Sequence, residues 1–169
     1  PQLRALRSDP RLIADPLADN VVAGVGADER VLIVGAGLTA AEIGKLSAAQ
    51  AKALGNAQLS ALSGAQIGAI TTSAFAALSA TQLGALNTTQ VAALTSTEMN
   101  GLNTTNMQAL SSSSVGGLTT TTIAALNTTA LNNMTTAQIA SLSTTAASAL
   151  TSTDLSGLST TNIQALSAK

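Results

Sequence analysis

The chain has 169 residues and a formal net charge of −1, and only 9% of its residues are charged. It contains no Cys and no His, which excludes disulfides, thiolate chemistry and the usual zinc and haem ligand sets. Phe75 is its single aromatic residue, and this deficit favours a thin, elongated body, because a compact globule normally has aromatic mass in its core.

Residues 1–38 differ in composition from the rest of the chain, and we expect them to form an N-terminal capping or docking segment. Three Arg and three Asp are concentrated in the first twenty residues, and Pro10 and Pro16 interrupt them. The spacing of the Leu residues allows one or two short amphipathic helices that break at the prolines. We favour a cap for the first coil of a solenoid over a docking segment for another subunit. The chain begins at Pro1 without Met or a signal-peptide pattern, which indicates a processed form or an excised fragment.

Residues 31–44 resemble the strand, Gly-rich turn and helix of a dinucleotide-binding Rossmann unit. That interpretation would place a pyrophosphate on Gly35, Gly37 and Ala40. The acidic residue expected about twenty positions further on is missing, because residues 55–60 contain none, and no second βαβ unit follows. We therefore predict no nucleotide cofactor.

Residues 24–28 are similar to one turn of a calcium-binding Gly-Asp nonapeptide. Such sites need stacked copies to complete the oxygen ligand set, and only one copy is present, so we predict no metal site. The simpler interpretation is a short strand at residues 31–34, paired with residues 21–25 or with another chain.

Residues 39–166 consist of an eight-residue sequence repeat, the octad, which occurs sixteen times without insertion or deletion. Residues 167–169 are a tail. The first place of the octad is Ser, Thr or Asn in fifteen copies and Gly55 in the other. The eighth place is Leu in fourteen copies, with Ile70 and Met134 as the exceptions. The fifth place is apolar throughout: Ile43, Ala51, Leu59, Ile67, Phe75, Leu83, Val91, Met99, Met107, Val115, Ile123, Leu131, Ile139, Ala147, Leu155 and Ile163.

Three start signals for a helix fall in the same frame of the octad. The first-place residues are those preferred at a helix N-cap. Half the copies carry Glu or Gln three residues later, which is the capping box, as in the pairs Ser47 and Gln50, Ser63 and Gln66, Ser79 and Gln82, and Thr95 and Glu98. The eighth place of one octad and the fifth of the next have the spacing of a hydrophobic staple. The sequence therefore predicts a new helix of about two turns every eight residues.

Two other architectures compete with short helices. In one continuous helix the apolar stripe would shift by roughly 80° per octad, so it could not stay on one side. A β-solenoid suits the abundance of Thr, Val and Ile, but the fifth and eighth places would point to opposite faces of a strand. They share one face of a helix. We predict an all-α solenoid, with the β-solenoid as the alternative.

One octad cannot fold alone. Burial of its two large side chains and an Ala contributes about 4–6 kcal/mol, whereas ordering eight backbone residues costs about 8–16 kcal/mol before hydrogen bonds are counted. Copies must stack to cover each other's apolar faces. The seventh place is usually Ala, Gly or Ser, which would allow close backbone approach or a tight turn.

The number of octads per coil stays open. Residues 95–110 nearly repeat as residues 151–166, which suggests that units of two octads were duplicated. The two copies lie seven octads apart, an odd number, so a register of two octads per coil does not follow.

The predicted surface is polar and almost uncharged. Between residues 47 and 166 the only charged side chains are Lys52, Glu98 and Asp154, so the basic stripe that nucleic-acid binding requires is missing. The chain has no run of eighteen apolar residues, which argues against membrane insertion. A neutral surface of Ser, Thr, Asn and Gln leaves the chain free to associate with itself.

The octads resemble the low-complexity repeats of very large secreted bacterial surface proteins of the adhesin type. This class is exported by type I secretion and is often described as haem-utilisation or adhesion proteins. The resemblance covers residues 39–166 and implies an extracellular or cell-surface location. It brings no haem ligand, because His is absent and Met99, Met107 and Met134 lie on the apolar stripe.

We therefore expect a structural protein, a rod, stalk or filament subunit that associates end to end, with no catalytic, cofactor-binding or metal-binding residues. One alternative is an adhesive module that binds ice or glycan through ranks of threonines, namely Thr71 and Thr72, Thr88 and Thr89, and residues 119–122. A fragment of a nucleotide-binding enzyme is the other alternative, and it depends only on residues 31–44.

Overall fold

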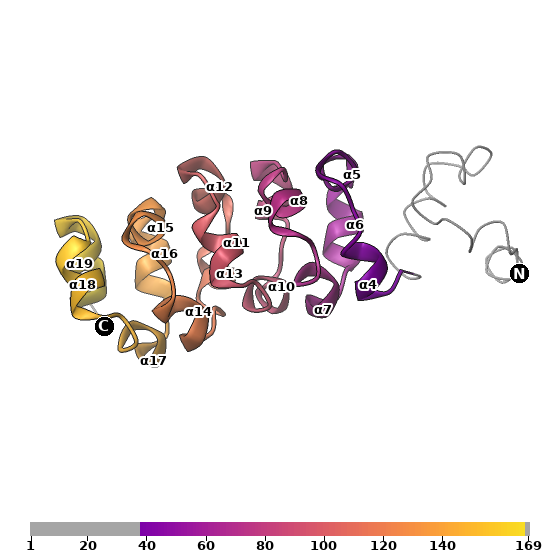
Figure 1. The fold of residues 1–169 in the computed structure, drawn as a ribbon. Coiled ribbons are helices and arrows are strands. Elements are labelled where there is room, and N and C mark those ends of the chain that lie inside the picture. Colours follow the sequence, from indigo (N-terminus) through magenta and orange to yellow (C-terminus); the bar gives the residue numbers. More distant parts are fainter. Residues whose placement is uncertain (1–37, 168–169) are drawn as a thin grey trace, which may run out of the picture.

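The computed structural model describes residues 38–167, and within them every octad forms one α-helix. In chain order the helices are α4 (Ala40–Ile43), α5 (Ala48–Ala53), α6 (Asn56–Ala61), α7 (Gly64–Ile67), α8 (Thr72–Ala76), α9 (Ala80–Gly84), α10 (Thr88–Ala92), α11 (Ser96–Asn100), α12 (Thr104–Ala109), α13 (Ser112–Val115), α14 (Thr120–Ala124), α15 (Thr128–Asn133), α16 (Thr136–Ser141), α17 (Thr144–Ala147), α18 (Ser152–Gly157) and α19 (Thr160–Ser167). They follow one another along an elongated body (Figure 1). The prediction of an all-α solenoid is confirmed.

Each helix begins where the first place supplies a cap. The Ser79 hydroxyl accepts a hydrogen bond from the Gln82 N–H at 3.2 Å, and Gln82 Oε1 accepts one from the Ser79 N–H at 2.8 Å. The same reciprocal bonds form in the three other pairs named above, at Ser47, Ser63 and Thr95, and also at Thr39, Asn87 and Thr135. Gly55 has no side chain, and there only Gln58 caps, by accepting from the Gly55 N–H at 2.6 Å.

The helices contain between four and eight residues, so most are shorter than two full turns of 3.6 residues. The helices that reach the seventh place, other than α19, end because the eighth place leaves the helical conformation, as at Leu62, where φ is −71° and ψ is 141°. The next residue is already the N-cap of the following helix. The chain therefore turns once per octad, as the repeated start signals predict.

Three octads, or 24 residues, make one coil of the solenoid. Helices three apart in the sequence pack against one another, as α4 does on α7, α7 on α10 and α10 on α13. The body thus has three columns of helices, each built from every third octad. A unit of two octads does not match this coil, so the near-repeat of residues 95–110 records sequence similarity and not the structural period.

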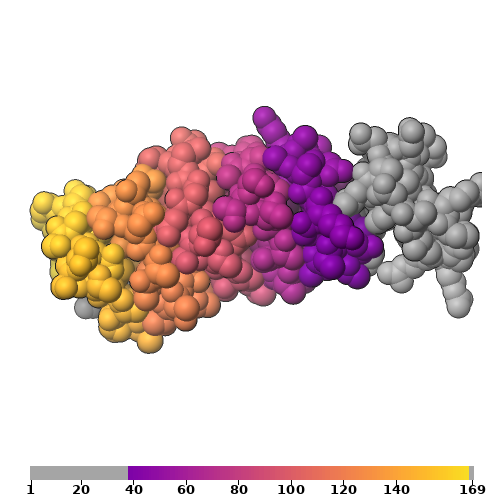
Figure 2. Space-filling model, viewed as in Figure 1, coloured from indigo at the N-terminus to yellow at the C-terminus, as the bar shows by residue number. Residues whose placement is uncertain are grey.

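The fifth and eighth places together form one continuous core. Fifth-place side chains from Ile43 to Ile139 are fully buried, with 0% of their surface exposed, and the eighth places lie beside them in the same cluster. Met99, Met107 and Met134 belong to this core, as predicted. The space-filling view shows the result, a rod whose sequence order runs along its length (Figure 2).

The β-solenoid alternative is wrong for the part of the chain that the structure describes. Residues 38–167 contain no strand. The capping bonds of the first place hold the following residues in a helical turn, and this local effect outweighs the β propensity of Thr, Val and Ile.

Small residues at the sixth and seventh places bring successive coils into close contact. A Cβ atom on Gly157, at the seventh place, would lie 2.5 Å from Thr128 Cγ2, and one on Gly117 would overlap Thr88 Cγ2. The small seventh place therefore lets the Thr side chains of the preceding coil pack closely against it. Gly101 caps α11 with φ at −82°, so glycine is not needed there for a left-handed turn.

Gly116→Ala is expected to lower the free energy of unfolding by about 1–2 kcal/mol, because the added methyl must push two backbones apart. Its Cβ would lie 2.7 Å from the Ser141 carbonyl oxygen of the next coil. Gly101→Ala is the control, since the nearest atom of another coil there is 3.9 Å away. Urea unfolding of both variants measures the difference, and equal midpoints would contradict the close-contact explanation.

The predictions for residues 1–37 lie outside the described residues, and so do residues 168–169 of the tail. These predictions are the N-terminal cap, the strand pairing, the calcium turn, and the Rossmann turn at Gly35 and Gly37. The structure does describe Ala40, which opens α4 behind the capping box of Thr39 and Glu42. This end of the Rossmann-like segment is thus an ordinary octad helix.

Candidate functional site: the seam between coils

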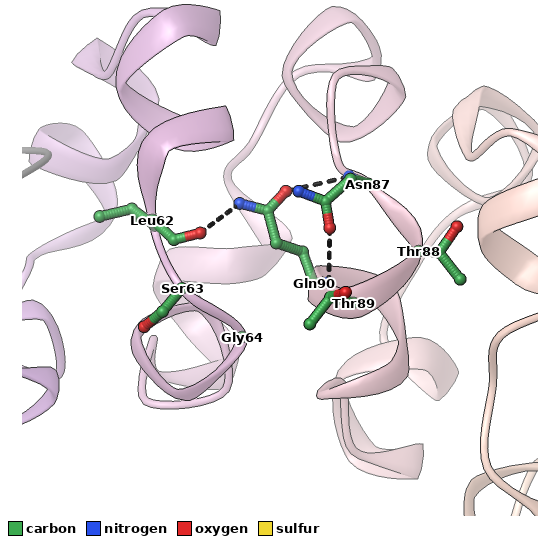
Figure 3. Close-up of a pocket in the computed structure, with 7 residues that line it drawn as sticks. All are labelled: Leu62, Ser63, Gly64, Asn87, Thr88, Thr89 and Gln90. Carbon is green, nitrogen blue, oxygen red and sulfur yellow. Dashed lines mark hydrogen bonds between the residues drawn. The ribbon is translucent and has the colours of Figure 1, made fainter.

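The fourth place of the octad joins each coil to the one before it. In α10 the Oε1 atom of Gln90 accepts a hydrogen bond from the Asn87 N–H at 3.0 Å and so caps its own helix. Its Nε2 atom donates to the Leu62 carbonyl oxygen at 2.6 Å, at the end of α6 (Figure 3). It also donates to the Leu59 carbonyl oxygen at 2.7 Å. A single buried amide therefore closes the start of one helix and the end of another, both of which would otherwise have unpaired backbone groups.

The same arrangement recurs with a fixed offset along the rod. Gln82 donates to the Leu54 carbonyl at 2.6 Å and Gln138 to the Leu110 carbonyl at 2.7 Å, each 28 residues earlier. Shorter side chains reach the equivalent carbonyl directly, as the Ser114 hydroxyl does at Leu86 and the Thr122 hydroxyl at Leu94. The offset of 28 residues is one coil of 24 plus the four residues from the eighth place to the next fourth place.

Glu98 interrupts the seam with a buried, unpaired oxygen, whereas Ala74, Ala130 and Ala146 interrupt it because their side chains have no donor. Its Oε2 atom accepts from the Thr95 N–H at 2.7 Å, as a capping box requires, and also from the Thr95 hydroxyl at 2.8 Å. Its Oε1 atom is buried and has no hydrogen-bond partner. A carboxylate has no proton to donate, whereas Gln at this place donates to the carbonyl 28 residues earlier, which here belongs to Ile70. Burial raises the pKa of Glu98, although the hydrogen bonds from Thr95 act in the opposite direction.

Two Asn side chains at the sixth place add bonds along the outside of the rod. Asn100 donates to the Ala125 carbonyl at 3.1 Å and accepts from the Asn127 N–H at 2.9 Å. Asn132 makes the equivalent pair with Gly157 and Ser159. Each Asn therefore spans the junction between two octads of the next coil.

The threonines through which the adhesive hypothesis would bind ice or glycan have different structural roles. Thr71 and Thr119 accept hydrogen bonds as N-caps, and Thr122 is buried in the seam. The exposed Thr88 and Thr89 lie in a different column from α8 and α14. These particular ranks therefore do not form one array. The third place is exposed in every octad, and its residues at α9, α12, α15 and α18 are all threonines in one column: Thr81, Thr105, Thr129 and Thr153.

A shallow surface hollow lies between α7 and α10 and is lined only by hydroxyl, amide and apolar groups. Its lining residues are Leu62, Ser63, Gly64, Asn87, Thr88, Thr89 and Gln90 (Figure 3). Its polar side chains Asn87 and Gln90 are occupied by the capping and seam bonds described above.

Within residues 38–167, no three His, Cys, Asp or Glu side chains gather as possible metal ligands. No helix in this part of the chain combines the length and the apolar character needed to cross a bilayer.

The sequence predicts one of the two roles of the fourth-place side chain, the capping bond that Glu and Gln make within their own octad. It does not predict the bond to the previous coil, because the partner of that bond depends on the number of octads per coil. The residue types at the fourth place do carry a signal for these bonds. The fourth place is Gln, Asn, Ser or Thr, all able to donate a hydrogen bond, in ten of the sixteen octads.

Residues 64–96 match the family model of the ALTTAQ repeat. The letters of that name run from the seventh place of one octad to the fourth place of the next, as Ala85-Leu86-Asn87-Thr88-Thr89-Gln90 does in this chain. The ALTTAQ match spans α7 to α10 and thus includes the Gln90 bridge. It supports a repeat region. No curated protein and no solved structure matches the chain.

Proposed function

We propose that the chain is a structural scaffold, a rod or filament subunit without catalytic activity. The observation that carries this proposal is the seam, in which fourth-place side chains from Gln66 to Asn162 bond to backbone carbonyls of the preceding coil at eight positions along the body. The seam occupies the fourth-place amides and hydroxyls with structural bonds. The third place, which is exposed in all octads, covers the outside with small, mostly polar residues.

The proposed location is the cell surface or the extracellular space. Its support is the resemblance of the octads to the repeats of large secreted adhesin-type proteins. The ALTTAQ match supports only the repeat itself. Uncharged hydroxyl and amide surfaces repel each other weakly, which favours association between copies.

The scaffold proposal predicts association that depends on concentration. Purified chain is expected to form end-to-end assemblies, visible as lengthening rods by negative-stain electron microscopy and as rising mass in analytical ultracentrifugation. Rods favour end contacts because an open solenoid end exposes apolar surface. Particles of one-chain mass at every concentration would contradict the proposal.

A further inference from the structure

Every first-place Asn of the octad array begins the tripeptide Asn-Thr-Thr. The three copies are residues 87–89, 103–105 and 127–129. Asn followed by any residue except Pro, and then by Ser or Thr, is the acceptor sequence for N-linked sugars. Among the other described Asn residues only Asn133 begins such a sequence, and those that do not are Asn56, Asn100, Asn106, Asn132 and Asn162. The Asn side chains of the seam and of the outer bridges are therefore not acceptors by sequence.

The helix cap at these three places uses the side-chain oxygen and leaves the nitrogen unbonded. Asn87 Oδ1 accepts a hydrogen bond from the Gln90 N–H at 3.0 Å (Figure 3). Asn103 and Asn127 use Oδ1 in the same way, at 2.9 and 2.8 Å. No described residue accepts a hydrogen bond from Nδ2 of any of the three. A sugar bonded to Nδ2 would therefore leave the cap intact, because an N-substituted amide keeps its carbonyl oxygen as an acceptor.

The acceptor Asn and the hydroxyl two residues later are on the surface in all three copies. Each first-place Asn is exposed, and so are the third-place residues Thr89, Thr105 and Thr129. The hydroxyls of these threonines make no hydrogen bond within the described chain. Asn87 also borders the surface hollow between α7 and α10, where the Ser63 and Thr88 hydroxyls offer polar partners to a first sugar ring.

Asn133-Met134-Thr135 is the fourth acceptor sequence, and the fold closes it. Asn133 is half-buried, and its Oδ1 accepts from the Thr104 hydroxyl of the previous coil at 2.8 Å. Met134 lies in the core with 3% of its surface exposed. The Thr135 hydroxyl accepts from the Gln138 N–H at 3.1 Å as an N-cap. An enzyme could bind this tripeptide only by pulling Met134 out of the core.

We propose that Asn87, Asn103 and Asn127 carry N-linked sugars in the folded chain and that Asn133 does not. The donor is a sugar activated by a phosphate ester at its anomeric carbon. Asn Nδ2 bonds to that carbon and loses one proton, while the carbon–oxygen bond to the phosphate breaks and the phosphate leaves with the bonding electrons. Asn103 and Asn127 begin helices one coil apart in the same column, so their sugars line one side of the rod. The proposal goes beyond the scaffold function and does not require self-association.

Mass spectrometry of the chain isolated from the cells that produce it tests this proposal. Elastase digestion followed by electron-transfer fragmentation assigns each added mass to a residue. We expect sugar on Asn87, Asn103 and Asn127, and none on Asn133. A single sugar at each site indicates a nucleotide-activated donor, whereas a preassembled oligosaccharide indicates a lipid-linked donor.

Thr89→Ala and Thr89→Ser form a matched pair of variants for one site. Both keep Asn87 and its cap, and circular dichroism establishes that both keep their helices. Thr89→Ala should lose the sugar on Asn87 alone, because the acceptor sequence lacks its hydroxyl, and Thr89→Ser should retain it.

Four results would overturn the proposal. They are asparagines without sugar in the native chain, sugar attached to Ser or Thr hydroxyls in place of Asn, sugar retained on Asn87 in Thr89→Ala, and sugar on Asn133. The last of these would show that the acceptors are chosen without regard to the folded structure. None of them affects the scaffold proposal.

Discussion

Replacing Gln90 by Ala is expected to lower the free energy of unfolding by about 3 kcal/mol, because buried backbone groups on both sides of the seam lose their partner. The variant removes the cap on the Asn87 N–H and the bond to the Leu62 carbonyl. Gln90 is only 1% exposed, so water cannot replace these bonds without opening the contact between the coils. Denaturant midpoints measured by circular dichroism provide the test.

Gln58→Ala is the matched control for this prediction. Gln58 has the same capping bond, to the Gly55 N–H, but no carbonyl of a preceding coil in the described structure. The decrease in the free energy of unfolding for Gln58→Ala should therefore measure the capping contribution alone, which is of the order of 1 kcal/mol. A loss for Gln90→Ala no greater than for Gln58→Ala would show that the bonds between coils contribute little.

Glu98→Gln is expected to raise the free energy of unfolding by about 2 kcal/mol at neutral pH, because the amide can donate where the buried carboxylate cannot. Oε1 of Glu98 has no partner, and the substitution keeps the shape and the capping oxygen. Glu42→Gln is the control, since Glu42 makes the same capping box on the first coil without a buried, unpaired oxygen. No increase in the free energy of unfolding is expected for Glu42→Gln.

The advantage of Glu98→Gln should depend on pH, with a sign fixed by the raised pKa of Glu98 in the folded chain. As pH rises above the ordinary carboxyl pKa, the unfolded chain releases its proton first, so the wild type loses stability until the folded pKa is passed. Below both values the protonated acid can donate as Gln does, and the two proteins should have similar stability. Glu42, whose pKa is lowered by the hydrogen bond from the Thr39 backbone, shifts both proteins alike.

Urea unfolding of wild type and Glu98→Gln across acid to neutral pH checks this dependence. The gap between the two midpoints should open as pH rises and then become constant. A gap of the same size at every pH would mean that the carboxylate is not the source of the weakness, and that Glu98 makes no better contact when protonated.

Local chemistry explains why so much of the fold could be predicted. A Ser, Thr or Asn followed three residues later by Gln or Glu needs only its own octad to start a helix, as at Ser79 and Gln82. The core places followed from the same local frame, because residues three apart share a helix face. These inferences did not require knowledge of how one octad lies on another.

The candidate site could not be predicted in the same way. The second function of Gln90, its bond to Leu62, joins residues 28 apart, and that distance is set by the number of octads in a coil. The number depends on how far the chain turns at each octad, here one third of a full turn, and the packing between coils sets that turn. The near-repeat of residues 95–110 therefore suggested pairs, whereas packing produced triplets.

The sequence by itself determined that each octad is a short capped helix with its fifth and eighth places inside, because caps and helix faces are properties of neighbouring residues. Only the tertiary structure decided that three octads close a coil and that the fourth-place amide joins coils. These features depend on contacts between residues more than twenty positions apart, which the geometry of the whole superhelix brings together.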